Sequence, residues 1–279
     1  MTASDPTLED PRALLAWYVA AGVDEAIGEV PIDRTAVPEP AVPSVAPAVR
    51  AAGPSEVPRP LPPMPSPAVA APRVALAGNA DSRALAAACG SVAELEAAVR
   101  GFDGCALRAT ATNTVFADGN PEAAVMLVGE GPGAEEDRLG LPFVGASGKL
   151  LDRMLAAIGL DRTRAYITNV VYWRPPGNRT PTPGELALCQ PFVERHIALA
   201  RPKVLIFSGG TAAKTLLGRA EGITRLRGRW YDFRPGDDVV IPAIATFHPS
   251  YLLRTPTAKR DAWRDLLAVK HKLEVLQTS

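Results

Sequence analysis

Residues 125–145, VMLVGEGPGAEEDRLGLPFVG, decide the fold, because an apolar run ends there abruptly in glycine and proline. Val125 to Val128 is a short, β-branched and apolar segment, which predicts a buried central strand. The glycines and the proline from Gly129 to Gly133 interrupt both strand and helix. The stretch therefore predicts a loop at the carboxyl end of a strand, which is where open α/β sheets bind ligands.

Strands and helices are predicted to alternate after this point. Further strands are predicted at 165–172, 204–207 and 239–246 (interrupted by Pro242), and helices at 145–159, 186–199, 209–217 and 263–276. The segment 101–124 is rich in Thr, Asn and Gly and is predicted to be irregular. The alternation indicates an α/β fold with a mostly parallel sheet that helices cover on both faces.

The rest of the chain divides into two regions before this domain. Residues 1–29 are predicted to contain one amphipathic helix, which begins at Asp10 and Pro11. Such a helix packs either on its own domain or on a protein partner. Residues 30–78 form a Pro/Ala-rich linker, with 13 of the 28 prolines in Pro31 to Pro72. This segment is expected to be a disordered, semi-rigid and extended tether that carries no chemistry. The folded domain is expected to span 79–279.

Composition and charge narrow the class of protein. The chain has 279 residues, is 47% hydrophobic and has no net charge, but residues 201–279 carry 14 basic and 7 acidic side chains. A basic region is typical of a phosphate-backbone binder, and also of an ordinary solvated surface. Three cysteines exclude a disulfide framework, and no apolar run has the length of a membrane span. With no signal-peptide pattern either, we expect a cytoplasmic protein.

Three polar or aromatic features follow predicted strands. They are the GEGPG loop, which contains Glu130 and leads to Phe143, then Asn169, and finally His248 within FHPSYLLR. Taken singly, each has an ordinary explanation: Glu130 caps a helix, Asn169 makes a turn, and His248 forms a structural hydrogen bond. Loops that follow parallel strands converge on one edge of a sheet, so we expect these side chains to form one site.

Longer motifs carry a resemblance to a known family. VGEGPGAEEDRLGLPFVGASGKLL, YITNVVYWRPPGNRTPTPGE, CQPFVERHIALARPKVLIFSGGTAAKTLLG and FHPSYLLR resemble, in this order and at similar spacing, the family-4 uracil-DNA glycosylases of bacteria and archaea. The resemblance covers about residues 101–270. It implies a three-layer α/β/α sandwich and a monofunctional hydrolase that removes uracil from DNA, which starts base excision repair. Hypoxanthine and xanthine stay open as further substrates.

The resemblance and the chemistry of base flipping together assign roles. Phe143 would stack on the flipped base, and Asn169 would read O4 and N3 of uracil. His248 would hydrogen-bond O2 and stabilise the negative charge on the departing base, aided by backbone N–H groups around Gly131. Glu130 would position or deprotonate water, or stabilise positive charge on the sugar.

Other residues are expected to hold the DNA or the loop. The expected contacts to DNA phosphates are Ser147 and Lys149, near the start of a predicted helix, together with Arg179 and Arg254. Leu252 or Leu253 is expected to insert as a wedge into the space that the flipped base leaves in the stack. For the leucines a place in the core, and for the arginines a solvated surface, stay open as alternatives. Glu136 is predicted to position the loop or a water molecule.

The chain departs from the family at the iron–sulfur ligands. Family-4 enzymes hold a four-iron cluster with four cysteines; here Cys105 and Cys189 match the second and fourth positions, but Phe102 and Trp173 occupy the first and third. Cys89 matches no motif position. Because the usual ligation takes four thiolates, we expect no cluster and no other metal or cofactor. Phe102 and Trp173 are expected to fill the space, with Cys105 and Cys189 as buried thiols.

The sequence therefore predicts a cluster-free, monomeric DNA glycosylase that acts on DNA containing uracil or other deaminated bases. A homologue that binds DNA or a protein partner without catalysis is one alternative, which the missing ligands and the added N-terminal region favour. The joint presence of Glu130, Phe143, Asn169 and His248 argues against it. A nucleotide-binding protein that uses GEGPG and SGGTAA as phosphate loops is the other alternative, and it leaves FHPSYLLR unexplained.

Overall fold

The computed structural model describes residues 73–236 and 239–278. The predicted N-terminal helix (1–29) and most of the predicted linker (30–78) lie outside the described residues. The first described helix, α2, begins at Arg73 rather than at residue 79. Leu85 on this helix is exposed.

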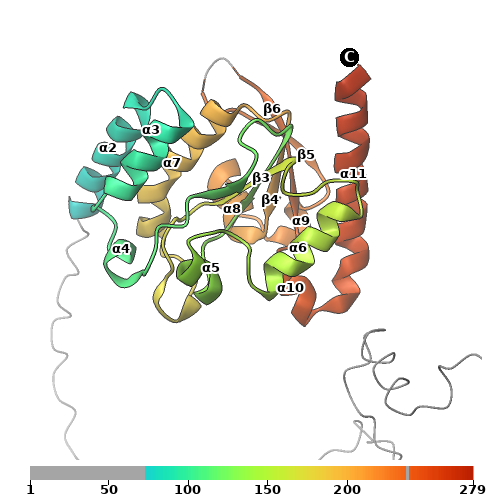
Figure 1. Cartoon of the computed structure of the whole chain (residues 1–279), viewed down its shortest axis with the longest axis horizontal. Coiled ribbons are helices and arrows are strands. Elements are labelled where there is room, and N and C mark those ends of the chain that lie inside the picture. The colour runs from blue at the N-terminus through green and yellow to red at the C-terminus, as the bar shows by residue number, and fades with distance from the viewer. Residues whose placement is uncertain (1–72, 237–238, 279) are drawn as a thin grey trace, which may run out of the picture. The chain divides into compact units, whose positions relative to one another are not determined.

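A sheet forms the middle of the domain (Figure 1). It has six strands, in the order β1-β3-β2-β4-β6-β5. The strands are β1 (Ala117–Gly119), β2 (Val125–Gly129), β3 (Ala165–Asn169), β4 (Val204–Ser208), β5 (Trp230–Phe233) and β6 (Ile241–Thr246). The four central strands pair in parallel, and β1 and β5 pair antiparallel to them at the two edges. The predicted mostly parallel sheet is confirmed.

Helices connect and cover the strands. They are α2 (Arg73–Ala88), α3 (Val92–Gly101), α4 (Leu107–Thr110), α5 (Ala134–Leu139), α6 (Ala146–Ala156), α7 (Pro183–Ala200), α8 (Gly210–Leu217), α9 (Ile223–Leu226), α10 (Pro249–Arg254) and α11 (Lys259–Thr278). Short 3-10 turns span Pro176–Asn178 and Pro256–Ala258. Within the described ranges, no helix has the length and apolarity needed to cross a membrane.

The alternation of side chains along the buried strands builds a core on each face of the sheet. Every residue of β2, β3 and β4 is buried. Met126 and Val128 pack with residues of α7 and α8 on one face, whereas Val125 and Leu127 pack with residues of α6 and α11 on the other. Figure 1 shows the sheet edge-on between these helices. The three-layer α/β/α sandwich is therefore confirmed.

Two local predictions differ from the structure. Pro242 does not interrupt its strand, because β6 runs through it. Pro242 lies before the residues of β6 that pair with β4, and only β5 pairs with the strand at this position. The missing N–H of Pro242 therefore removes no hydrogen bond between β6 and β4. The segment 101–124 is not wholly irregular, since it contains the single turn α4 and the three-residue edge strand β1, both too short to produce a periodic pattern.

A third apolar cluster lies where α2, α3 and α7 meet the segment after β3. Trp173, Cys189 and Phe192 are fully buried in it, and Phe102 and Cys105 are almost fully buried. The Phe102 ring lies edge-on to Phe192, with ring centroids 5.1 Å apart, and 6.5 Å from the Trp173 ring. The aromatic side chains and the two thiols thus belong to one buried cluster.

Candidate active site

A cleft of about 510 Å³ opens at the carboxyl ends of the parallel strands. Glu130 follows β2, Asn169 ends β3, and His248 follows β6, while Phe143 reaches the cleft from the loop between α5 and α6. The structure brings these four predicted residues together in one cavity. The reason is topological, because β2 and β3 pair in parallel with Gly129 opposite Asn169, so both strands end at the same edge.

Phe143 forms one wall of the cleft. Its side chain is only 4% exposed, and its ring stacks on the imidazole of His248 with 5.3 Å between ring centroids. Its backbone has φ +54°, the left-handed region that non-glycine residues rarely adopt. A Cβ at Gly148 would lie 1.7 Å from the carbonyl oxygen of Phe143, so glycine at that position lets the following helix approach the strained residue.

Asn169 presents an unpaired polar atom to the site. The residue is 1% exposed, and its Oδ1 has no hydrogen-bond partner among the described residues. A buried amide oxygen without a partner is costly, which is typical of a group that awaits a ligand. A Cβ at Gly129 would lie 2.4 Å from this oxygen and 2.6 Å from the Phe143 ring. Only glycine at 129 therefore lets both side chains keep their places.

His248 is held as a neutral imidazole with a defined tautomer. Its Nδ1 accepts a hydrogen bond from the backbone N–H of Ser250 at 3.1 Å and lies 2.7 Å from Ser250 Oγ. Burial lowers the pKa of His248 to about 4, with a further decrease from the positive charge of Arg254, which Glu136 partly opposes. Because Nδ1 acts as the acceptor, the proton of the neutral ring lies on Nε2.

Glu130 is fixed by one hydrogen bond. The hydroxyl of Thr211, in the first turn of α8, donates to Glu130 Oε2 at 2.6 Å. The second carboxylate oxygen of Glu130 accepts no hydrogen bond from the described residues, which leaves it able to bind water. Next to it, a Cβ at Gly131 would lie 2.5 Å from a methyl group of Val171, so the backbone passes close to the segment after β3.

Glu136 ties the two ends of the cleft loop together. Its Oε2 accepts the N–H of Gly133 at 3.1 Å, and its Oε1 accepts the N–H groups of Val144 and Gly145, each at 3.0 Å. Both carboxylate oxygens of Glu136 thus bind backbone N–H groups, one before α5 and two after it. The geometry is that of a loop-positioning residue.

The residues expected to bind DNA differ in their positions. Ser147 and Arg254 line the cleft, and Lys149 is exposed on α6. Arg179 also lines the cleft, but its guanidinium forms an ion pair with Glu185 at 2.7 Å. A DNA phosphate that binds Arg179 would therefore compete with Glu185 for its guanidinium, or bind to the N–H groups that Glu185 leaves free.

The expectation that Leu252 contacts DNA is wrong. Its side chain is 1% exposed and packs with Leu150, Phe247 and Ala262 between α10, α6 and α11. Neighbouring Leu253 is 42% exposed. Successive residues of a helix point about 100° apart, so only one of two adjacent leucines can face the core here.

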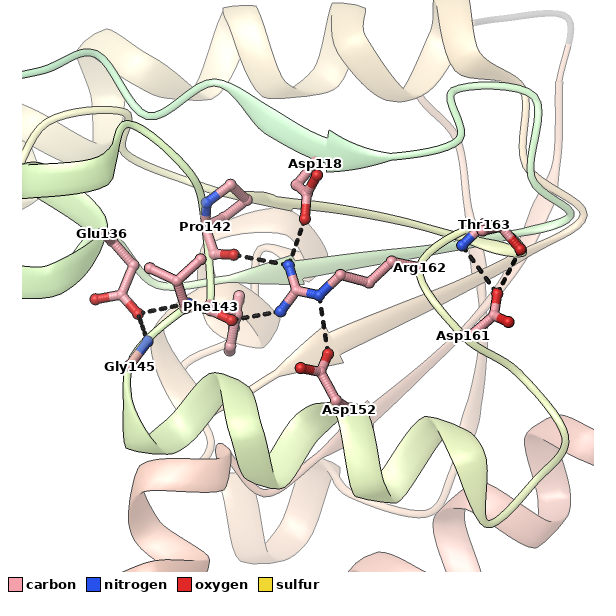
Figure 2. Close-up of polar contacts among 10 residues, drawn as sticks. Asp118, Glu136, Pro142, Phe143, Gly145, Asp152, Asp161, Arg162 and Thr163 are labelled. Carbon is pink, nitrogen blue, oxygen red and sulfur yellow. Dashed lines mark hydrogen bonds and ion pairs between the residues drawn. The ribbon is translucent and has the colours of Figure 1, made fainter.

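Three residues of the site were missed from the sequence. Thr211 and Ser250 fix the side chains of Glu130 and His248, and Arg162 donates to backbone carbonyls beside Phe143 (Figure 2). Thr211 and Ser250 lie within the motifs SGGTAA and FHPSYLLR, which follow predicted strands. Their positions therefore indicated that both residues could lie at the site. Arg162 lies before a strand and gave no such signal.

Comparisons with known proteins identify the family of this domain. A family model described as the uracil DNA glycosylase superfamily matches residues 116–267. The chain is 46% identical over 151 residues to a type-4 uracil-DNA glycosylase of Thermotoga maritima, which covers 54% of this chain and 77% of that protein. It is 42% identical over 162 residues to the type-4 enzyme of Archaeoglobus fulgidus, covering 56% of this chain and 80% of that one.

A third relative is matched over most of its length. The type-4 uracil-DNA glycosylase of Pyrobaculum aerophilum is 37% identical over 177 residues, which are 62% of this chain and 90% of the relative. The matched family region contains all four side chains that converge in the cleft. The chain therefore belongs to the uracil DNA glycosylase superfamily, with the type-4 enzymes as its relatives.

Proposed function

We propose that this protein hydrolyses the N-glycosidic bond of uracil in DNA, acts on a flipped-out nucleotide, and leaves an abasic site for base excision repair. It is a hydrolase of N-glycosyl bonds, in agreement with the activity named for its type-4 relatives. The observation that carries the proposal is the convergence of Glu130, Phe143, Asn169 and His248 in one cleft. Each supplies a different part of the chemistry that base excision needs.

Recognition of the base would use Phe143 and Asn169. A flipped uracil loses its neighbours in the DNA stack, and the Phe143 ring offers an aromatic surface in their place. The unpaired Oδ1 of Asn169 is an acceptor for the N3–H of uracil, and the amide N–H₂ is a donor for O4. Cytosine presents the reverse arrangement, a ring nitrogen without hydrogen beside an amino group, and would leave this amide mismatched.

Departure of the base would use His248. When the glycosidic bond breaks, its electron pair moves to the base and negative charge develops on O2. The Nε2–H of the neutral imidazole can donate to this oxygen, and the bond from Ser250 to Nδ1 fixes the ring for that contact. A donor held in place before the reaction stabilises developing charge without reorganisation.

Attack on the sugar would use Glu130. As the base departs, positive charge develops on the sugar, and a carboxylate beside it lowers the energy of that state. The bond from Thr211 occupies one carboxylate oxygen and leaves the other for a water molecule. Glu130 would orient this water and accept its proton as the new C–O bond forms.

The same recognition edge suggests further substrates. Hypoxanthine and xanthine also carry a carbonyl beside a ring N–H, which is the pattern that Asn169 would read in uracil. We propose them as secondary substrates. Leu253, Ser147, Lys149 and Arg254 are the proposed contacts to DNA outside the base pocket. A monomeric state, a cytoplasmic location and a protein partner for residues 1–29 stay predictions.

The residues around Cys105 and Cys189 do not fit an iron–sulfur cluster. The chain has three cysteines in all, and Phe102 and Trp173 occupy the positions of two ligands. The indole N–H of Trp173 donates to Thr114 Oγ1 at 3.0 Å, which ties the ring to the neighbouring loop. Cys105 and Cys189 belong to the same buried cluster, and a hydrogen bond from Cys189 lowers the pKa of Cys105. We propose that aromatic packing replaces the cluster here.

The first prediction concerns activity. A uracil-containing oligonucleotide that has been incubated with wild-type protein, and then treated with alkali, is expected to break at the position of uracil. Glu130→Gln and His248→Ala are each expected to reduce the single-turnover rate by at least about 100-fold, because each removes a group that acts on developing charge. Glu135→Gln is the matched control, since this exposed carboxylate pairs with Arg138 on the surface.

Other outcomes of this assay separate the alternatives. Folded wild type that binds DNA but produces no alkali-sensitive site would favour the non-catalytic homologue. Tight nucleotide binding without DNA binding would favour the nucleotide-binding protein. Strands with hypoxanthine and xanthine measure the substrate range in the same experiment.

The second prediction concerns pH. NMR of the imidazole nitrogens is expected to give a midpoint of about 4 for His248. Between the ordinary value of about 6.5 and this midpoint, the unfolded chain binds a proton that the folded chain does not. The free energy of unfolding should therefore decrease as pH falls through this window, and less steeply in His248→Ala. A midpoint near the ordinary value would contradict the buried neutral ring.

The third prediction concerns iron. Protein purified without oxygen, and then incubated with iron and sulfide, is expected to remain colourless and to lack a stable complement of either element. Iron and sulfide at about four per chain, with visible absorption that survives gel filtration, would show that the proposal of a cluster-free fold is mistaken.

A further inference from the structure

The strained backbone of Phe143 needs a cause, because a residue at φ +54° persists only where its surroundings hold it. We infer that Arg162 is a positioning residue which, together with Glu136, locks the peptide group after Phe143 and so holds the proposed base-stacking ring in the cleft. This inference rests on the proposed function of Phe143. It adds a residue that has no contact with the base.

Arg162 reaches the loop from the segment before β3 (Figure 2). Its guanidinium donates to the carbonyl oxygen of Phe143 and, at 3.1 Å, to that of Pro142. The same group forms ion pairs with Asp118 of β1 at 2.5 Å and with Asp152 of α6 at 2.9 Å. One side chain therefore connects the sheet edge, a helix and the cleft loop.

Glu136 holds the other side of the same peptide group. The peptide between Phe143 and Val144 has its carbonyl bonded to Arg162 and its N–H bonded to Glu136 Oε1. Figure 2 shows the two side chains on opposite sides of the loop. A peptide plane bonded at both ends cannot rotate without breaking a charge-assisted hydrogen bond. The rotation of this plane sets the ψ angle of Phe143, and so the backbone that carries its ring.

The chemistry of this contact requires arginine. Arg162 bonds to two carbonyls and two carboxylates from four directions, and a guanidinium has five N–H donors in one plane. The side chain of Arg162 is 25% exposed, and the negative charges of Asp118 and Asp152 compensate its charge there. A lysine ammonium has three donors at one point and cannot reach all four partners. A glutamine would lose the charge as well.

Loss of Arg162 should weaken the stacking of the flipped base and leave the contacts to the DNA backbone unchanged. Without the bonds from Arg162 to the carbonyls of Pro142 and Phe143, both peptide planes that flank Phe143 can rotate. The residue can then return to negative φ, which moves its ring away from His248. A displacement of about 1 Å in a positioned group can cost about 100-fold in rate. DNA that carries tetrahydrofuran, an abasic analogue, has no base to stack, so its affinity should stay unchanged.

The experiment compares Arg162→Gln and Arg162→Lys with the control Arg164→Gln. This control removes a nearby arginine that bonds the backbone of Gly159, away from the cleft. We expect Arg162→Gln to lose between about 10-fold and 100-fold in the single-turnover rate on uracil DNA. Arg162→Lys should lose less, and Arg164→Gln should stay close to wild type.

Two further readouts make the test decisive. Tetrahydrofuran DNA should bind Arg162→Gln as it binds wild type, whereas equal losses of excision and of this binding would reduce Arg162 to a structural role and overturn the inference. Wild-type excision by Arg162→Gln would overturn it too. The ring protons of His248, stacked on Phe143, should shift in the NMR spectrum of Arg162→Gln and not of Arg164→Gln. Because this shift needs no activity, an inactive wild type would refute the proposed function, and an unchanged spectrum would refute the clamp.

Discussion

The contact of Gly129 with Asn169 and Phe143 is the constraint on which the rest of the site depends. Gly129 is the last residue of β2, and parallel pairing places it opposite Asn169, the last residue of β3. The absence of a Cβ at this position allows the amide oxygen and the aromatic ring to approach the same backbone atom. The sheet thus determines the distance between the group that would read the base and the group that would stack on it.

The residues around this contact hold the side chains of the site in place and leave one polar atom of His248 and one of Glu130 free to bind the substrate or water. Ser250 bonds the Nδ1 of His248, and Thr211 bonds one oxygen of Glu130, so each side chain keeps a free polar atom. Glu136 and Arg162 bond the backbone rather than the side chain of the loop that carries the aromatic ring. Preorganisation of this kind lets a site bind developing charge without first rearranging.

The sequence predicted the parts of this arrangement that follow from local pattern. The apolar run at Val125 to Val128 indicated a buried strand, and polar residues after successive strands indicated convergence at one edge. It misassigned Leu252, because two adjacent leucines in a single helical turn give no sign of which one faces the core. Arg162 was missed because its partners lie up to 44 residues away in the chain, and hydrogen bonds of this kind leave no periodic signal.

The most direct measurement is the rate at which Gly129→Ala releases free uracil from uracil-containing DNA, compared with Gly101→Ala. A Cβ at 101 meets no atom within 4 Å, whereas a Cβ at 129 meets the amide and the ring. We expect Gly129→Ala to lose at least about 100-fold in rate but still to bind tetrahydrofuran DNA, and Gly101→Ala to release uracil like wild type. Uracil release by Gly129→Ala at the wild-type rate would show that the site does not depend on the close approach of Asn169 and Phe143 to Gly129.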